Sequence, residues 1–166
     1  MQPWRFIVIR DPAVREAVNN LFTEANAKAC AQYANDRKDL YASMKLAGLR
    51  EAPQHLCVVC DTASPQGHGL GRQTMPETAL YSAVCAVQNL WLAARAEGIG
   101  VGWVSILDPA ALRATLHVPE GMALIAYLCI GYVDNFGEDP ELERLGWERR
   151  APLEQCVSYD RYEVSR

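Results

Sequence analysis

The sequence has few of the residues that usually mark a metal site or a hydrolytic centre. It contains three histidines, at positions 55, 68 and 117, and none has a carboxylate or a cysteine at ligand spacing. A G-x-S-x-G nucleophile motif and a Walker phosphate loop are absent as well. We therefore expect no metal and neither of these two chemistries.

Long hydrophobic runs and clusters of basic residues are missing too. No apolar stretch is long enough to cross a bilayer, and the first residues lack the basic flank and apolar centre of a signal peptide. Lys and Arg (16) are scattered and outnumbered by Asp and Glu (20), which gives a net charge of -4. These absences predict a cytoplasmic protein that binds neither nucleic acid nor a membrane.

The composition is that of one ordinary globular domain. The chain has 166 residues and half of them are apolar, so it can bury a core without disulfides or metals. We expect a single domain over residues 1–166, in which 134–166 forms an extended tail because it has little periodicity. The six cysteines lie mostly in apolar runs, which predicts reduced thiols.

Three helix starts share a side-chain acceptor followed by proline: Asp11-Pro12, Thr74-Met75-Pro76 and Asp108-Pro109. The second has the T-x-x-E order of a capping box, in which Thr74 and Glu77 would satisfy each other's backbone amides. It opens the longest expected helix, from Met75 to about Glu97, with Gly98 as its stop. The other expected helices cover about 12–34, 36–49 and a short stretch after 108.

Four strands are expected between these helices, because short runs rich in Val, Ile, Tyr or Trp are typical of strands. They cover 5–10, 56–61, 100–106 and 124–133. Strands interleaved with helices indicate a layered domain of helices and sheet. The "CVVC" stretch lies in the second strand, where Cys57 and Cys60 would point to opposite faces. We therefore interpret it as packing and not as a redox pair.

Two glycine clusters bear on ligand binding. "GHGLGR", residues 67–72, lacks the order of a dinucleotide-binding turn, and a loop is favoured over a phosphate cradle. "GIGVGWVSI", residues 98–106, has three glycines that leave a backbone segment without side chains, as a flat ligand requires. Trp103 then offers an apolar wall and Ser105 a hydroxyl on the same side of the strand. On spacing alone, the interpretation in which Ser105 only ends a strand is favoured.

Five stretches together resemble the nitroreductase-like flavoproteins: "MQPWRF", "GRQTMPET", "YSAVCAVQNLWLAARAEGIGVGWVSI", "AYLCIGY" and "PELERLGWERRAPLE". Within that family they are most similar to the branch that makes 5,6-dimethylbenzimidazole, the lower ligand of vitamin B12. In the family, "MQPW" follows helices with an R-R-D-V-R motif, whose arginines bind the FMN phosphate. The resemblance therefore implies that this chain is N-terminally truncated relative to the family.

The resemblance implies an α+β fold, with a nitroreductase-like three-layer α/β/α arrangement around a central mixed sheet. It implies a homodimer with FMN at the subunit interface. The implied reaction is the oxygen-dependent fragmentation of reduced FMN, so that FMN is the substrate, O₂ is consumed, and NAD(P)H or a flavin reductase supplies the electrons. Two alternatives remain open: an FMN-dependent nitroreductase or NAD(P)H oxidoreductase, and an inactive fragment that lacks the FMN phosphate site.

The resemblance also assigns three site residues. Ser105 matches a catalytic serine that hydrogen-bonds the flavin, and Arg37 and Leu46 match positions that contact FMN. The Arg37 guanidinium suits a phosphate or a ring carbonyl, whereas Leu46 can only line a pocket. The chain departs from the family at "MKLAG", residues 44–48, where "LKLEG" is usual, so an acidic group is lost beside the flavin.

Overall fold

The computed structural model describes residues 2–162, and the chain divides into two units, Met1–Val133 and Asp134–Arg166. The first unit holds the sheet and the long helices. Its elements in chain order are β1 (Trp4–Ile9), α1 (Pro12–Cys30), α2 (Asn35–Ser43), β2 (Gln54–Asp61), the 3-10 turn η1 (Gln66–Gly69), α3 (Thr78–Ala96), β3 (Ile99–Trp103), α4 (Pro109–Thr115) and β4 (Met122–Tyr132). None of the helices described in residues 2–162 is long and apolar enough to cross a bilayer.

The four strands form one sheet in the order β1-β2-β4-β3. All three neighbouring pairs are antiparallel, so the expectation of a mixed sheet is wrong for the described strands. The reason is the position of β4. The crossover from β2 through α3 makes β2 and β3 parallel to each other, but β4 lies between them and runs opposite to both.

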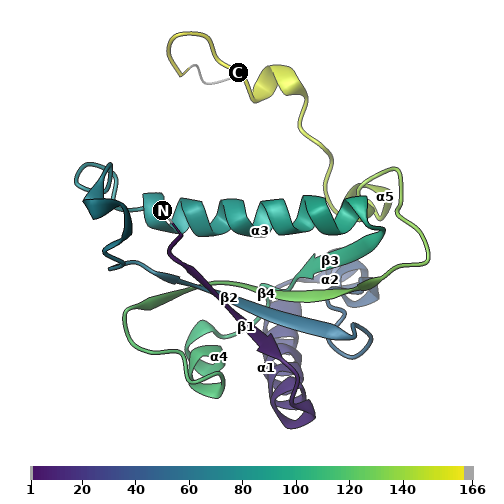
Figure 1. Cartoon of the computed structure of the whole chain (residues 1–166). Coiled ribbons are helices and arrows are strands. Elements are labelled where there is room, and N and C mark those ends of the chain that lie inside the picture. The colour runs from purple at the N-terminus through teal and green to yellow at the C-terminus, as the bar shows by residue number, and fades with distance from the viewer. Residues whose placement is uncertain (1, 163–166) are drawn as a thin grey trace. The chain divides into compact units, whose positions relative to one another are not determined.

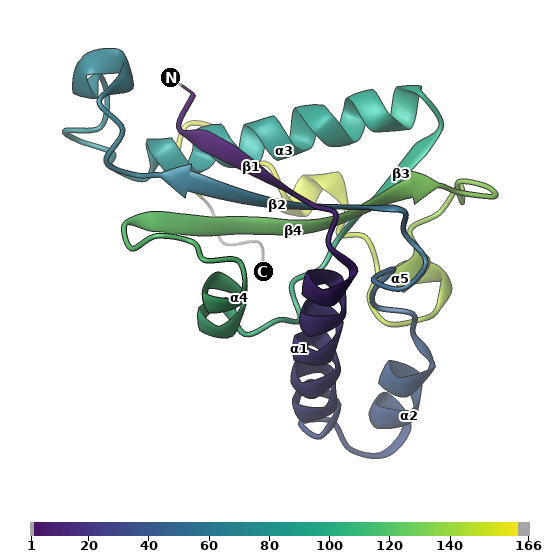
Figure 2. The same cartoon turned by 60° about the horizontal axis from the view of Figure 1, so that its bottom comes forward.

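Helices cover both faces of the sheet (Figures 1 and 2), which confirms the α+β class with α/β/α layers. On one face α3 packs through Val87 against Val58 and Leu128, and through Ala79 and Ala83 against Cys60. On the other face α1 and α4 pack against residues of β2 and β4. That second core contains Val18, Cys57, Val59, Leu112, Tyr127 and Cys129.

The proline-marked starts of α1 and α4 are confirmed. The Asp11 carboxylate accepts from the amide of Ala13 at 2.8 Å, and that of Asp108 from the amide of Ala111 at 2.8 Å. Both helices have proline in the first turn. Each helix therefore begins where its own sequence satisfies the free amides of its first turn.

The predicted capping box before α3 is wrong. Thr74 Oγ1 donates back to the carbonyl of Gly71 at 3.4 Å, and the Met75 amide bonds the same carbonyl at 3.1 Å. Residues 71–77 are therefore used in turns, and the helix begins at Thr78, with Glu77 as an N-cap that makes no side-chain bond. Local turn formation thus outcompeted the capping pattern.

The helix expected over 36–49 is shorter in the structure, because α2 ends at Ser43 and Met44 is extended. The chain then runs from 44 to 53 without helix and places Leu49 in the core beside α1. This link between α2 and β2, residues 44–53, is called the linking segment below. It forms one wall of the larger of the two cavities described below.

The two cysteines of "CVVC" point to opposite faces of the sheet, as expected. Cys57 lies in the core beside α1, whereas Cys60 packs beside Ala79 of α3. Burial raises the pKa of the Cys57 thiol to about 12 and also raises the pKa of Cys60. Both thiols are therefore protonated at neutral pH and serve in packing.

The second unit contains two short helical turns, α5 (Glu141–Arg144) and η2 (Leu153–Gln155). Its described residues are nearly all exposed to solvent. Within the unit, the Trp147 amide donates to the carbonyl of Leu142 at 2.8 Å and closes α5. The absence of periodicity in the sequence agrees with this low content of regular structure.

Candidate functional site

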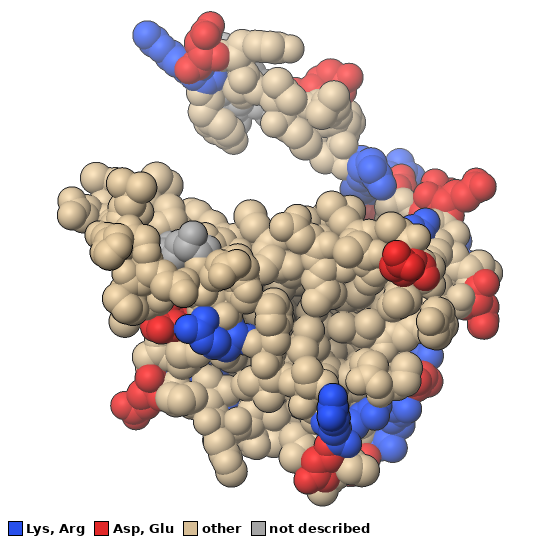
Figure 3. Space-filling model, viewed as in Figure 1, with Lys and Arg blue, Asp and Glu red and all other residues tan. Residues whose placement is uncertain are grey.

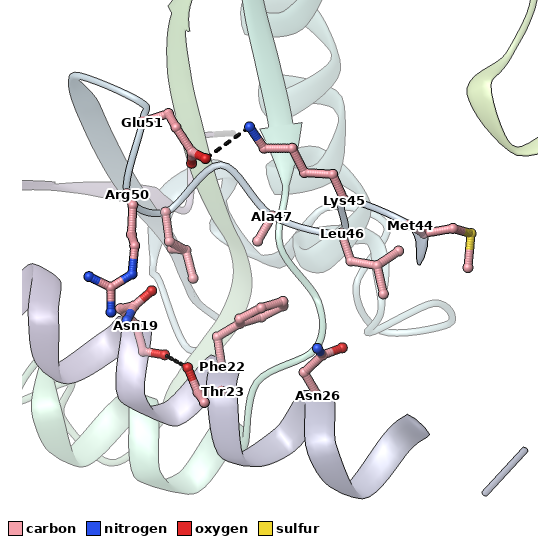
Figure 4. Close-up of a pocket in the computed structure, with 11 residues that line it drawn as sticks. Asn19, Phe22, Thr23, Asn26, Met44, Lys45, Leu46, Ala47, Arg50 and Glu51 are labelled. Atoms are coloured by element: carbon pink, nitrogen blue, oxygen red, sulfur yellow. Dashed lines mark hydrogen bonds and ion pairs between the residues drawn. The ribbon is translucent and has the colours of Figure 1, made fainter. Parts of the chain in front are cut away.

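A cavity of about 420 Å³ lies between α1 and the linking segment, within the size range of ligand pockets. Figure 4 shows side chains of α1 pointing toward the linking segment across this space. The cavity is lined by Asn19, Phe22, Thr23, Asn26, Met44, Lys45, Leu46, Ala47, Leu49, Arg50 and Glu51. Leu46, one of the predicted FMN contacts, is therefore part of its wall.

The helical period explains how α1 presents its part of this lining. Phe22 and Thr23 lie three and four residues after Asn19, and Asn26 lies four and three residues after them, so the four residues share a face of the helix. The facing wall is chain without helix or strand, which places Leu46 opposite this stripe (Figure 4). The result is an apolar floor with amide groups at both ends.

Asn19 is the least satisfied of these groups. Its residue is 6% exposed, and its Nδ2 atom has no hydrogen-bond partner among the described residues. A buried amide without a partner costs about 1–3 kcal/mol of stability, so such a group is a candidate for binding a ligand acceptor. Asn26, one turn from the Phe22 ring, already accepts a bond from the Tyr41 hydroxyl of α2 at 2.8 Å.

Charged side chains stand at the rim of the cavity. Lys45 Nζ lies 2.9 Å from a carboxylate oxygen of Glu51, and Arg50 lies 3.3 Å from Glu16 of α1. Hydrogen bonding to Lys45 lowers the pKa of Glu51, so that carboxylate is ionised at neutral pH. All four side chains are exposed, so these pairs can open to an incoming anion at little cost.

Ser105 lies in a second, smaller cavity of about 210 Å³. It follows the end of β3, and Val104 before it is buried while Trp103 and Ser105 are both exposed. Its hydroxyl makes no hydrogen bond to a described residue, and its carbonyl accepts from the Leu107 amide at 2.9 Å. The other lining residues are Trp103, Val104, Leu107, Pro109, Leu112, Leu124, Ile125, Ala126 and Tyr127.

The three predicted site residues are not gathered in one cavity of this chain. Leu46 lines the larger cavity, Ser105 lines the smaller one, and the two linings share no residue. Arg37 is exposed on α2 and belongs to neither lining. It precedes Tyr41 by one helical turn, and Tyr41 holds Asn26 at the edge of the larger cavity.

The glycines of "GIGVGW" fit the expected role only in part. A Cβ at Gly100 would lie 2.5 Å from Cγ1 of Val133, so that position is filled by a side chain of the same chain and is closed to a ligand. Gly98 has a positive φ of 74° and ends α3, as its place after the helix predicts. At Gly102 the nearest atom to a Cβ is a carbonyl oxygen at 4.0 Å, so this backbone remains accessible.

The donors of the larger cavity fit a flat ring system that carries carbonyl oxygens. The Asn19 amide offers an unused N–H group, Lys45 and Arg50 offer positive charge, and Phe22 and Leu46 offer apolar surfaces. A flavin has these features in its ring carbonyls and its apolar ring edge. The residues present therefore fit the group that the family resemblance implies.

Sequence reasoning did not identify Asn19, Phe22, Asn26 and Lys45 as cavity residues. A signal existed for the first three, because α1 carries polar residues at positions 19, 23 and 26 around Phe22, on a helix face that a core would fill with apolar residues. Lys45 carried no such signal. Its placement depends on α2 ending at Ser43, which the pattern did not predict.

The nitroreductase family profile matches residues 1–132 of the chain. A 5,6-dimethylbenzimidazole synthase of Rhodospirillum rubrum is 56% identical over 151 residues, which cover 91% of this chain and 72% of that protein. A 5,6-dimethylbenzimidazole synthase of Rhodobacter capsulatus is 42% identical over 92% of this chain and 74% of its own length. Among solved structures, iodotyrosine deiodinase bound to FMN and 3-iodo-L-tyrosine shares the fold, with a TM-score of 0.69 at 19% identity over 97% of this chain and 78% of that one.

Proposed function

The chain belongs to the nitroreductase family, and from this premise we propose that it is a 5,6-dimethylbenzimidazole synthase. Its reaction would be the oxygen-dependent fragmentation of reduced FMN, which yields the lower ligand of cobalamin. The observation that carries the proposal is the 56% identity to the Rhodospirillum rubrum synthase over 91% of the chain. Identity at this level, spread over a whole domain, supports a shared reaction as well as a shared fold.

The geometry supports a flavin as the bound molecule. The unpaired Asn19 amide suits a ring carbonyl, and Leu46 and Phe22 suit the ring faces. Reduced FMN would supply both the electrons for O₂ and the carbon skeleton of the product. Arg37, near the cavity edge, would bind the phosphate or a ring carbonyl through its guanidinium.

Ser105 is the residue for which we propose a catalytic role. Its hydroxyl can donate a hydrogen bond to a ring nitrogen or accept one from it. No described residue forms a hydrogen bond with this hydroxyl. Trp103 beside it would exclude water from one side of the bound ring. At Gly102 the neighbouring backbone carries no side chain, so the bound ring would have room to approach it closely.

A homodimer would explain why the site residues are divided between two cavities. Tyr81, Val84 and Leu92 are exposed large hydrophobic residues on α3, turned away from the sheet. Of the nineteen residues of α3 only Arg95 is charged, and Figure 3 shows the uncharged surface along this helix. We propose that two copies pack through α3, with FMN bound at the interface between them.

The function is tested by incubating the chain with reduced FMN and O₂ and measuring 5,6-dimethylbenzimidazole by mass spectrometry. NAD(P)H with a flavin reductase regenerates the reduced flavin, and the Rhodospirillum rubrum protein is the positive control. Product is the expected result. Full recovery of FMN together with NAD(P)H oxidation would replace the proposal by an NAD(P)H oxidoreductase, and failure to bind FMN in equilibrium dialysis would indicate an inactive fragment.

Ser105→Ala should lower the rate of product formation by roughly 100-fold, the usual cost of one missing hydrogen bond at a reacting group. Ser105→Thr keeps the hydroxyl and should retain most of the rate. Thr115→Ala is the matched control, because that hydroxyl bonds only the Ala111 carbonyl of its own helix, at 2.9 Å, among the described residues. An unchanged rate in Ser105→Ala would remove Ser105 from the chemistry.

The dimer is tested by Leu92→Asp, which places a charge on the proposed interface. Sedimentation velocity should show the parent chain as a dimer and the variant mainly as a monomer, because an unpaired buried charge opposes association. Leu70→Asp changes a leucine that is 90% exposed outside α3, and it should leave the dimer intact. A dimer that survives Leu92→Asp would place the interface elsewhere.

A further inference from the structure

A buried polar cluster joins α1, the linking segment and the sheet beside the larger cavity. His55 of β2 is fully buried, and its Nδ1 lies 2.8 Å from the Tyr127 hydroxyl of β4. Its Nε2 lies 2.9 Å from Nη2 of Arg15 on α1. His55 and Arg15 belong to neither cavity lining described above, whereas Tyr127 also lines the smaller cavity. The proposed reaction uses neither His55 nor Arg15.

The protonation state of His55 follows from its partners. A guanidinium carries only donors, so Nε2 must be an unprotonated acceptor. The ring is then neutral, and its single proton is on Nδ1, where it is donated to Tyr127 Oη. A second proton, on Nε2, would set two donors and two positive charges against each other, so protonation breaks the contact with Arg15.

Arg15 is also the group that binds the end of the linking segment. Its Nη2 donates to the carbonyl of Ala52, and its Nη1 donates to that of Pro53 at 3.3 Å. The Pro53 ring in turn lies against Gly131, where a Cβ would approach its Cδ to 2.6 Å. Arg15 therefore holds one end of the segment whose other end carries Lys45 and Leu46.

We propose that Arg15 and His55 are positioning residues, which hold the linking segment against α1 while the imidazole is neutral and release it when the ring is protonated. The segment is the outer wall of the larger cavity, so ligand binding there would weaken in acid. The part of this inference that concerns FMN rests on the proposed function. The part that concerns the ring and the segment stands independently of it.

The other titratable groups around His55 do not change charge in the same pH range. Burial raises the pKa of Cys57 to about 12 and that of Cys129 to about 11, and it raises the pKa of Tyr127 as well. The pKa of Glu51, in the linking segment, is lowered. Burial, and then the charge of Arg15, lower the pKa of His55 below its usual 6.5. Hydrogen bonding to the backbone of Ala52 and Leu49 offsets this only in part, so the ring is neutral at pH 7 and takes up its proton below 6.5.

The direct test observes the ring and the segment in the full chain without ligand. Nitrogen-15 NMR of the imidazoles should show His55 as the neutral tautomer with its proton on Nδ1 at pH 7. Hydrogen exchange of the Ala52 amide, which donates to the Gly48 carbonyl at 2.9 Å, should be slow at pH 7.5. After correction for intrinsic rates, it should become about tenfold faster at pH 5, which corresponds to the loss of one charge-assisted hydrogen bond.

Variants of His55 distinguish a role in positioning the linking segment from a contribution to stability alone. His55→Gln keeps an acceptor for Arg15 but cannot be protonated, so protection of the Ala52 amide should persist and lose its pH dependence. His55→Leu removes the acceptor and should give fast exchange at both pH values. His68→Asn is the matched control, because it removes an exposed histidine at a positive φ of 51°, which asparagine tolerates, and should behave as the parent.

FMN affinity, measured by equilibrium dialysis, provides the second readout. Between pH 7.5 and pH 5 the dissociation constant should rise about tenfold more in the parent and in His68→Asn than in His55→Gln, in which only the FMN phosphate changes charge. A His55 proton on Nε2, or exchange that is independent of pH in the parent, would overturn the inference. Failure of every variant to bind FMN would refute the proposed function, while the NMR and exchange data would still decide this inference.

Discussion

The two faces of the central sheet are built on different principles. The face toward α3 is apolar, with a core of aliphatic side chains such as Val58, Val87 and Leu128, against which Trp4 and Trp91 pack. The face toward α1 has an apolar core as well, but it also buries His55 against Tyr127 and Arg15. Dispersion and the hydrophobic effect act on both faces, whereas directional bonds set the geometry on only one.

This difference coincides with the position of the cavities. The larger one lies beside α1, and the smaller one is lined by Leu112 of α4 and Tyr127 of β4, so both are associated with the polar face. Apolar packing tolerates small shifts, but a hydrogen-bonded cluster fixes a few atoms closely and can hold an extended segment open as a wall. The α3 face, in contrast, leaves its exposed hydrophobic residues on the outside of the helix, where a second copy can bind.

Adjacent residues of β4 allow the two faces to be compared directly, because Leu128 points toward α3 and Tyr127 toward α1. The larger effect is expected for Leu128→Ala. Leu128 is fully buried, and its truncation leaves a cavity in a face that has no polar group to reorganise. The free energy of unfolding should fall by about 3 kcal/mol in urea titrations, by the same amount at pH 5 and pH 7.5.

Leu70→Ala is the control for that experiment, since Leu70 is 90% exposed and its loss should change stability by less than about 0.5 kcal/mol. A loss in Leu128→Ala that depends on pH would mean that the two faces are coupled through the sheet. A loss below about 1 kcal/mol would mean that α3 shifts to fill the space.

The sequence predicted the elements better than their arrangement. The starts of α1 and α4 followed from Asp-Pro pairs, because a cap acts within one turn of the chain and needs no tertiary information. All four strands were located to within about three residues, since β-branched runs bounded by turns are local signals as well. The order of the strands in the sheet could not be predicted from local signals. The insertion of β4 between β2 and β3 depends on which edges pair in three dimensions.

The site was less predictable from the residues themselves. Leu46 and Ser105 do line cavities, but they were assigned by family resemblance and not by pattern. The early end of α2, which brings Lys45 to the cavity, has no helix stop signal in the sequence and accompanies the burial of Leu49. His55 was interpreted as lacking metal partners, and no sequence pattern could show that Arg15, forty residues earlier, meets its ring.

Tyr127→Phe gives the smaller effect and sharpens the contrast between the faces. It keeps the ring in place and removes only the oxygen that accepts from His55 Nδ1, so a buried N–H group loses its partner. The free energy of unfolding should fall by about 1.5 kcal/mol. Both the neutral and the protonated ring carry a proton on Nδ1, so the loss should be similar at pH 7.5 and pH 5.

The parent itself should lose stability as the pH falls below 6.5, because the pKa of His55 is lowered in the folded state and the unfolded chain then binds the extra proton. Tyr127→Phe should therefore shift this pH profile downward without changing its shape, whereas His55→Leu should flatten it. A flattened profile in Tyr127→Phe would instead show that the tyrosine, and not Arg15, controls the protonation of the ring.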